Sequence, residues 1–151
     1  MSNVYKSYVV FKVDDLFCAF DCLDVQEIIR DVSNVKNICR SDSFISGVIN
    51  LRGEIVTVIS LKEFFSMESE AEEAAIVVAN CGKEHIGFMV KDIVDVIELR
   101  GDQIESSPAV PKGLEQDFIK GVFELDSELI TVLNVEGLAH LEDETAASGG
   151  V

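Results

Sequence analysis

The chain contains the same eighteen-residue pattern twice, and this duplication limits the folds that it can adopt. Residues 44–61 read F-I-S-G-V-I-N-L-R-G-E-I-V-T-V-I-S-L, and residues 118–135 read F-I-K-G-V-F-E-L-D-S-E-L-I-T-V-L-N-V. Aligned without a gap, the two stretches are identical at eight of the eighteen positions. Four further positions exchange one aliphatic residue for another, which preserves a buried position. The chain is therefore predicted to consist of two copies of one structural unit.

Each copy of the pattern contains two β-branched runs around a short polar turn, which is typical of a β-hairpin. In the first copy the turn is Arg52-Gly53, and Gly53 can take the positive φ that a tight hairpin requires. In the second copy the turn is Asp126-Ser127, which is expected to turn by other chemistry. A hairpin at this place therefore does not require an arginine at position 52.

The duplication extends upstream of the hairpins. Segments 9–20 and 77–90 are each predicted to form two strands joined by a tight turn. Residues 22–30 are predicted to form a short helix capped by Asp21. Three aliphatic residues would lie on or near one face of this helix, namely Val25, Ile28 and Ile29.

Two copies with short strands and tight turns predict an all-β fold with short helices, arranged as two small tandem β-barrels rather than one sandwich. Closing each sheet into a barrel removes the unpaired edges that promote aggregation. The predicted organisation is a first barrel over 1–67 with its hairpin at 47–60, an acidic linker over 68–73, a second barrel over 74–134, a helical turn over 135–141 and a disordered tail over 142–151.

The composition argues against several classes of partner. The 151 residues include 12 basic and 28 acidic side chains, so the formal net charge is −16. This charge repels phosphate backbones and anionic lipids, so neither nucleic-acid binding nor direct membrane contact is expected. No apolar stretch is long enough to span a membrane, and the N-terminus does not resemble a signal peptide, so a cytoplasmic protein is predicted.

The sequence offers little for catalysis. None of the common nucleotide-binding, hydrolase or metalloprotease motifs occurs in it. Only His85 and His140 could act as bases near neutral pH, and His85 is predicted to be a packed structural residue. We therefore predict that the chain is not an enzyme and needs no cofactor. One alternative remains open, a small metal or redox domain that would use Cys18, Cys22, Cys81 and His85.

Several of these stretches resemble a known family. The run V-Q-E-I at 25–28, the first hairpin pattern, D-I-V-D-V at 92–96 and the F-I-K-G-V of the second hairpin are similar to the CheW family of chemotaxis coupling proteins. The resemblance covers about residues 5–141. It implies two five-stranded SH3-like barrels and a non-catalytic adaptor that links the cytoplasmic tips of chemoreceptors to the regulatory domain of the histidine kinase CheA. Such an adaptor would be recruited to membrane-associated receptor arrays.

The resemblance leaves one alternative of the same class. CheV-like proteins and the regulatory module of CheA contain similar domains, so the chain could be such a domain without its receiver or kinase part. No receiver or kinase segment lies within the 151 residues, which favours the stand-alone adaptor.

The resemblance also nominates residues that would bind a receptor. A receptor tip is a helical hairpin, so an apolar strip that accepts one amphipathic helix is expected. Glu27 and Arg52 are implied to lie close together beside this strip, and Arg52 can pair with a carboxylate through two parallel hydrogen bonds. The receptor-binding candidates are Val25, Glu27, Ile28, Ile29, Arg52, Val94 and Val96.

Contact with the kinase is expected to join barrel to barrel. The implied kinase-binding residues are Val35, Ile38, Phe44 and Val110. The chain departs from the family pattern at three places. Thr57 stands where the family often has proline, and Ser60 and Asn134 stand where aspartate is common.

Overall fold

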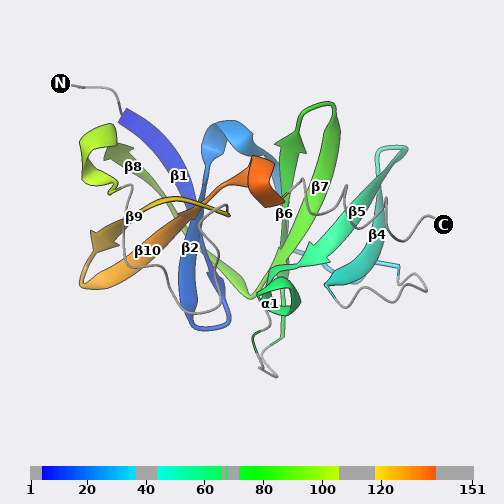
Figure 1. Ribbon diagram of the computed structural model, residues 1–151. Helices are drawn as coiled ribbons and strands as arrows, with labels where there is room; N and C mark the ends of the chain where they lie inside the picture. The colour runs from blue at the N-terminus through cyan, green and yellow to red at the C-terminus, as the bar shows by residue number, and fades with distance from the viewer. Residues whose placement is uncertain (1–4, 37–43, 66, 68–71, 106–117, 139–151) are drawn as a thin grey trace.

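The structure is a computed structural model that describes residues 5–36, 44–65, 67, 72–105 and 118–138. Two five-stranded β-sheets lie side by side and account for most of these residues (Figure 1). Each sheet closes into a barrel, which confirms the predicted all-β fold with two five-stranded barrels.

The first sheet, which we call barrel A, has the strand order β8-β1-β2-β10-β9. The parallel pair β2–β10 lies in its middle, and the other pairs are antiparallel. A bridge between Glu105 and Val122 joins the two edges of the sheet. The strands are β1 (Tyr5–Val13), β2 (Leu16–Asp21), β8 (Asp92–Arg100), β9 (Ile119–Leu125) and β10 (Glu128–Leu133).

The second sheet, barrel B, has the order β3-β6-β7-β5-β4 and repeats this plan. Its parallel pair is β5–β7, and a bridge between Lys36 and Val48 joins its edges. The strands are β3 (Val25–Ile29), β4 (Ile45–Leu51), β5 (Glu54–Ser60), β6 (Ala75–Cys81) and β7 (Glu84–Val90).

The barrels are not the two sequence halves, and the predicted division at the acidic linker is wrong in this respect. Barrel A combines β1 and β2 of the first copy with β8, β9 and β10 of the second, so blue and orange strands share one sheet (Figure 1). The exchange occurs at the parallel pairs, where β2 pairs with β10 and β7 pairs with β5, each from the hairpin of the other copy. Most of the predicted linker and the tail over 142–151 lie outside the described residues.

The two barrels repeat each other in register. The β4–β5 turn pairs Leu51 with Glu54, and the β9–β10 turn pairs Leu125 with Glu128. Edge strands β3 and β8 carry a bulge at the same point, and the parallel pairs also match. This register makes four pairs of positions equivalent, namely Glu27 and Asp95, Arg52 and Asp126, Glu54 and Glu128, and His85 and Phe17.

The helix predicted over 22–30 is wrong. A single 3₁₀ turn, η1 (Cys22–Asp24), is followed directly by β3. Asp21 does cap this turn, because its Oδ1 accepts the N–H of Leu23 at 2.9 Å. The β-branched residues that follow favour a strand, and β3 pairs with β6 at the edge of barrel B. Tertiary pairing therefore prevails over the helical spacing of the apolar residues.

The hydrophobic core has three parts. One cluster lies inside each barrel, and the largest cluster joins both sheets. In the joint cluster the ring centroids of Phe11 and Phe20 are 5.0 Å apart, and those of Phe20 and Phe88 are 5.4 Å apart. Strand β6 is buried over residues 75–79, because one of its faces fills barrel B and the other meets barrel A. This two-sided burial explains its uninterrupted apolar run.

Short helical segments follow the hairpins and cover the joint core. Helix α1 (Leu61–Phe64) follows β5, and a helical turn over 135–138 follows β10. The second agrees with the helical turn predicted over 135–141, over the part that the structure describes. A second 3₁₀ turn, η2 (Gly101–Gln103), precedes the bridge that closes barrel A.

Ser60 joins α1 to the segment that leads into β6. Its Oγ accepts the N–H of Glu63 as the helix cap and lies 2.8 Å from both carboxylate oxygens of Glu73, to which it donates. Burial raises the pKa of Glu73, against the effects of the Ser60 hydrogen bond and of Lys62. The Ser60 hydroxyl therefore serves as the hydrogen-bond donor to a half-buried carboxylate.

Replacing Ser60 with aspartate, the residue common in the family, is expected to destabilise the protein by about 1–2 kcal/mol at pH 7.5, because it places two carboxylates together without a shared proton. Since the pKa of Glu73 is raised in the folded state, the penalty appears as the pH rises through that pKa and shrinks below it. Urea unfolding at pH 5 and pH 7.5 measures this. Ser60→Ala removes the hydroxyl without adding charge and is the control. Equal stability of Ser60→Asp and the parent protein at pH 7.5 would contradict the expectation.

The two hairpin turns use the same backbone conformation, although only one contains glycine. The φ angles are 51° at Arg52 and 91° at Gly53, and 50° at Asp126 and 68° at Ser127. The expectation that the second turn uses other chemistry is therefore wrong at the level of the backbone. Ser127 adopts a left-handed conformation that disfavours a side chain.

Ser127→Gly is expected to stabilise the protein by about 0.5–1 kcal/mol, because relief of the left-handed strain exceeds the added entropy of the unfolded chain. The reverse change in the other hairpin, Gly53→Ser, is expected to cost a similar amount. Chemical denaturation of both variants measures the difference. A loss of stability in Ser127→Gly would show that its hydroxyl matters more than the strain.

Candidate functional site

Glu27 and Arg52 form an exposed ion pair on barrel B. Glu27 lies on edge strand β3, just after its bulge, and Arg52 lies in the β4–β5 turn. Both guanidinium Nη atoms donate to the carboxylate: Nη2 to Oε1, and Nη1 to Oε2 at 3.4 Å. The Arg52 side chain is 65% exposed and that of Glu27 is 29% exposed. The sequence-based expectation that these two residues lie close together is confirmed.

The hydrogen bond is the largest electrostatic influence on both partners. It lowers the pKa of Glu27 and raises the pKa of Arg52, so both side chains stay charged near neutral pH. Exposed ion pairs contribute little to folding, because solvent screens them. The pair is therefore better suited to presenting a charge pattern than to holding the barrel together.

A second acid–base pair, formed by hydrogen bonding, lies beside the first. His85 on β7 places its Nδ1 2.9 Å from Oε1 and 3.0 Å from Oε2 of Glu54 on β5. The two pairs interact electrostatically, because His85 lowers the pKa of Glu27 and Glu54 raises the pKa of Arg52. We call these four residues the polar cluster.

The prediction that His85 is simply packed in the core needs correction. Its side chain is 26% exposed, and its ring pairs with Glu54 at the surface of barrel B. Sequence reasoning missed this because His85 aligns with Phe17 of the first strand pair, which suggests an apolar environment. The informative signal was Glu54. Both hairpins have glutamate at this position, whereas the facing position on the neighbouring strand changes from His85 in barrel B to Phe17 in barrel A.

The apolar candidates on β3 are half-buried rather than exposed. Val25 packs against the joint core, and Ile29 packs against the core of barrel B. Ile28, on the same strand, is also half-buried. Because β3 is a strand, Ile28 and Ile29 lie on opposite faces, so the three residues do not form the single helical strip that the sequence predicts.

Val94 and Val96 lie on edge strand β8 of barrel A. Their exposed fractions are 48% and 53%, which is high for valine in a strand. They belong to a different sheet from the β3 candidates. Exposed apolar side chains at a sheet edge suit contact with another protein.

Two of the four kinase-binding candidates lie in the described part of the chain. Val35 is half-buried against the core of barrel B. Phe44 is half-buried and meets Phe64 edge to face, with the ring centroids 5.5 Å apart. Ile38 and Val110 lie outside the described residues.

Two further exposed aliphatic side chains were not expected from the sequence. Leu23 in η1 is 79% exposed, and Ile55 on β5 is 65% exposed. Ile55 directly follows Glu54 on β5, so its side chain is expected on the opposite face of the strand from that of Glu54. The alternation of Ile55 with buried Val56 could have identified it as an outward-facing residue.

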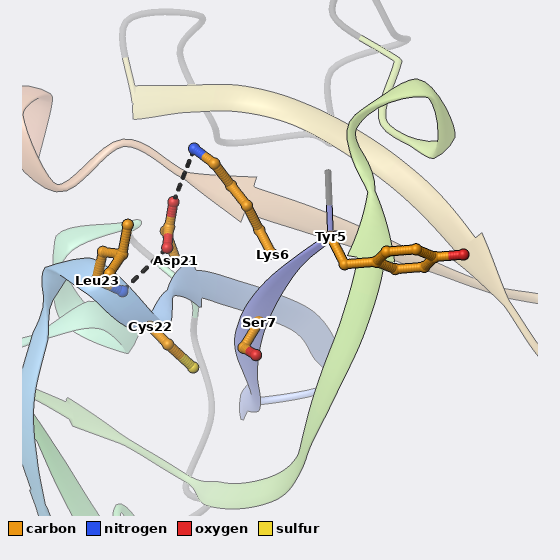
Figure 2. A pocket seen from close by; sticks show the side chains of 6 residues that line it. All are labelled: Tyr5, Lys6, Ser7, Asp21, Cys22 and Leu23. Carbon is orange, nitrogen blue, oxygen red and sulfur yellow. Dashed lines mark hydrogen bonds and ion pairs between the residues drawn. The ribbon is translucent and has the colours of Figure 1, made fainter. Parts of the chain in front are cut away.

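A shallow hollow of about 310 Å³ lies where β1 begins and β2 ends. Asp21 organises it: Oδ2 lies 3.5 Å from Nζ of Lys6, while Oδ1 accepts the N–H of Leu23 (Figure 2). The ring of Tyr5 lies apart from this group, and Cys22 lines the hollow next to Leu23 (Figure 2). Because Asp21 already has two partners within the chain, it serves mainly to fix the strand ends.

The cysteines do not support the metal or redox alternative. Burial raises the pKa of Cys18 far above its usual value, and the pKa of Cys22 is also raised by burial and then by Asp21. Reactive thiols and metal ligands need the opposite shift. Among the described residues, no group of three or more histidine, cysteine or acidic side chains is placed to hold a metal ion.

The described residues contain no helix with the length and apolar character needed to cross a bilayer.

The fold and the polar cluster together define a class of protein. Two packed barrels present the Glu27–Arg52 ion pair and several isolated aliphatic side chains on their surface. Such a mixture of arginine and apolar groups is frequent in protein-binding modules. The class is therefore that of double-barrel β proteins with an exposed ion pair on one barrel.

Comparison with known proteins identifies the family. The model of the CheW-like domain matches residues 7–143, so the chain belongs to the CheW-like family. The chemotaxis protein CheW of Klebsiella aerogenes is 30% identical over 143 residues, which cover 93% of this chain and 86% of that protein. The CheW protein of Thermotoga maritima is 28% identical over 152 residues, with 99% and 97% coverage.

A solved structure confirms the fold. The scaffolding protein TtCheW from Thermoanaerobacter tengcongensis superimposes with a TM-score of 0.81 at 29% sequence identity. The match covers 91% of this chain and 89% of that protein. The predicted fold class and family resemblance are thus both confirmed.

Proposed function

We propose that this chain is a chemotaxis coupling adaptor that links the cytoplasmic tips of chemoreceptors to the histidine kinase CheA. In this role it supports receptor control of kinase activity, has no catalysis of its own, and acts in the cytoplasm at membrane-associated receptor arrays. The observation that carries the proposal is the exposed Glu27–Arg52 pair on a double-barrel fold of the CheW-like family.

The comparison between the two hairpins supports a binding role for Arg52. Both turns have the same register and the same left-handed backbone, but the second has Asp126 at the position of Arg52. The hairpin therefore forms without a guanidinium. An exposed arginine with planar, directional hydrogen bonding is a frequent contributor to specific protein interfaces.

The apolar candidates suit a helical partner. Edge strands β3 and β8 carry Val25, Ile28, Val94 and Val96, which range from half-buried to exposed. An amphipathic receptor helix would cover such side chains, while its polar flank meets the Glu27–Arg52 pair. The regulatory domain of CheA would contact another part of the surface, for which Val35 and Phe44 are the described candidates.

The test is assembly of a ternary complex from the purified chain, the cognate CheA and a receptor cytoplasmic fragment. We expect the three proteins to co-sediment and the receptor fragment to change CheA autophosphorylation only when this chain is present. Omission of the chain is the matched control. Receptor control of the kinase that is equally strong without this chain would refute the adaptor role.

A further inference from the structure

A second hollow, of about 200 Å³, opens at the end of barrel A next to the β9–β10 turn. Its apolar wall includes side chains of the barrel interior, and three carboxylates lie around it. Its lining includes Phe17, Ile97, Leu125, Asp95, Asp126 and Glu128.

This pocket is the barrel A counterpart of the polar cluster. By the shared register, Asp95 stands at the position of Glu27, and Asp126 at that of Arg52. Glu128 in turn corresponds to Glu54, and Phe17 to His85. All four counterparts line the hollow.

The two sites differ in charge balance. In barrel B two carboxylates face the guanidinium of Arg52 and the imidazole of His85. In barrel A three carboxylates and a phenyl ring line the hollow, and among the described residues no cation forms an ion pair with any of the three carboxylates. Within the described part of the chain, barrel A thus has no ion-paired cation at the position that Arg52 fills in barrel B.

The walls of the pocket indicate which cation fits. Leu125 is 38% exposed, and Phe17 offers an aromatic face near the carboxylates. A guanidinium can donate to carboxylates in its plane and stack on an aromatic ring, whereas an ammonium is more strongly hydrated. Lys12 lies near the same ring, with its Nζ 5.2 Å from the centroid of Phe17, so one face of the ring already attracts a cation.

We propose that the pocket at the end of barrel A binds an arginine side chain of a protein partner. The arginine takes the place that Arg52 occupies in barrel B, with its guanidinium between Asp95 and Asp126 and its aliphatic stem along Leu125. This interaction surface is additional to the polar cluster, and it shares Val94 with the receptor-binding candidates proposed above. It also gives a function to part of the strong negative charge of the chain.

The test is a titration of the isotopically labelled full chain with N-acetyl-arginine amide, followed by NMR. We expect millimolar additions to shift the backbone amides of Asp95, Leu125 and Asp126, and not those of the already paired Glu27 and Arg52. N-acetyl-citrulline amide has nearly the same shape without the charge and is expected to cause no shift. N-acetyl-lysine amide is expected to bind about fivefold or more weakly than the arginine probe.

Two variants separate the pocket from general attraction to an acidic protein. Asp126→Arg should supply the missing guanidinium within the chain and abolish the shifts, while Asp126→Asn should weaken them about fivefold. Glu84→Gln removes one exposed carboxylate in barrel B and is the control, with unchanged binding. Equal shifts with citrulline or lysine, or unaltered binding by Asp126→Arg, would overturn the proposal. A retained thermal transition shows that each variant is folded.

Discussion

Arg52→Asp is expected to weaken formation of the ternary complex about tenfold or more while the thermal unfolding transition stays nearly unchanged. The variant gives the first hairpin the residue that the second has at Asp126, and aspartate there tolerates the left-handed backbone. It also places a carboxylate next to Glu27, which removes the bidentate pair and reverses the local charge. Titration of CheA and receptor fragment against the variant, with thermal unfolding measured in parallel, checks this expectation.

The control for this experiment is an arginine outside the polar cluster. Arg100 on β8 is also exposed and forms an ion pair with Asp102 at 3.3 Å. Arg100→Asp therefore makes the same change of charge at a different surface. This variant is expected to form the ternary complex nearly as well as the parent protein. Comparable losses in both variants would show that overall charge, rather than the site at Arg52, controls association.

Gly121→Ala is expected to destabilise the protein by about 2–3 kcal/mol, the largest effect on folding among the changes considered. A Cβ at this position would lie 2.6 Å from the carbonyl oxygen of Glu105 and 2.6 Å from Cγ2 of Ile104. The first contact is with backbone and cannot be relieved by rotating a side chain. The clash falls beside the bridge between Glu105 and Val122 that closes barrel A.

Urea denaturation of Gly121→Ala measures this effect. Gly101→Ala is the matched control, because a Cβ at Gly101 would meet no atom within 4 Å. We expect the control to change stability by less than about 1 kcal/mol. If both variants unfold at the same urea concentration as the parent protein, close packing against Glu105 is not what requires glycine at position 121.

The need for glycine at position 121 explains why both copies of the duplicated pattern contain this glycine. Glycine occurs at the same place in both copies, at Gly47 and Gly121. Each glycine is followed by the valine that forms the β-bridge closing its barrel. The F-I-x-G-V sequence therefore marks the point where the closing segment approaches the hairpin. Its repetition in the chain follows from closing a barrel twice.

The sequence predicted the local units of the fold well. Strand pairs, hairpins and the number of barrels follow from β-branched runs and short polar turns, which act over a few residues. It did not predict that β2 pairs with β10 and β7 with β5, because strand exchange between copies leaves each local pattern unchanged. The alternation of apolar residues is the same whichever barrel a strand joins.

The site was predicted in part. The proximity of Glu27 and Arg52 followed from family resemblance, and the structure confirms it. The Glu54–His85 pair was missed, because it joins β5 to β7 across a parallel contact that no short-range pattern encodes. The helix expected around Val25 was wrong, because the edge of barrel B provides backbone partners that an isolated segment lacks.

The most direct test of the adaptor account is ternary assembly by the double variant Glu27→Arg/Arg52→Glu. This exchange retains an ion pair between β3 and the hairpin turn but reverses the charges that a partner meets. The account predicts a protein that unfolds at nearly the same temperature as the parent chain and assembles with CheA and receptor about tenfold or more weakly. Full assembly by the double variant would show that the pair only supports the barrel, and would contradict a binding role for Arg52.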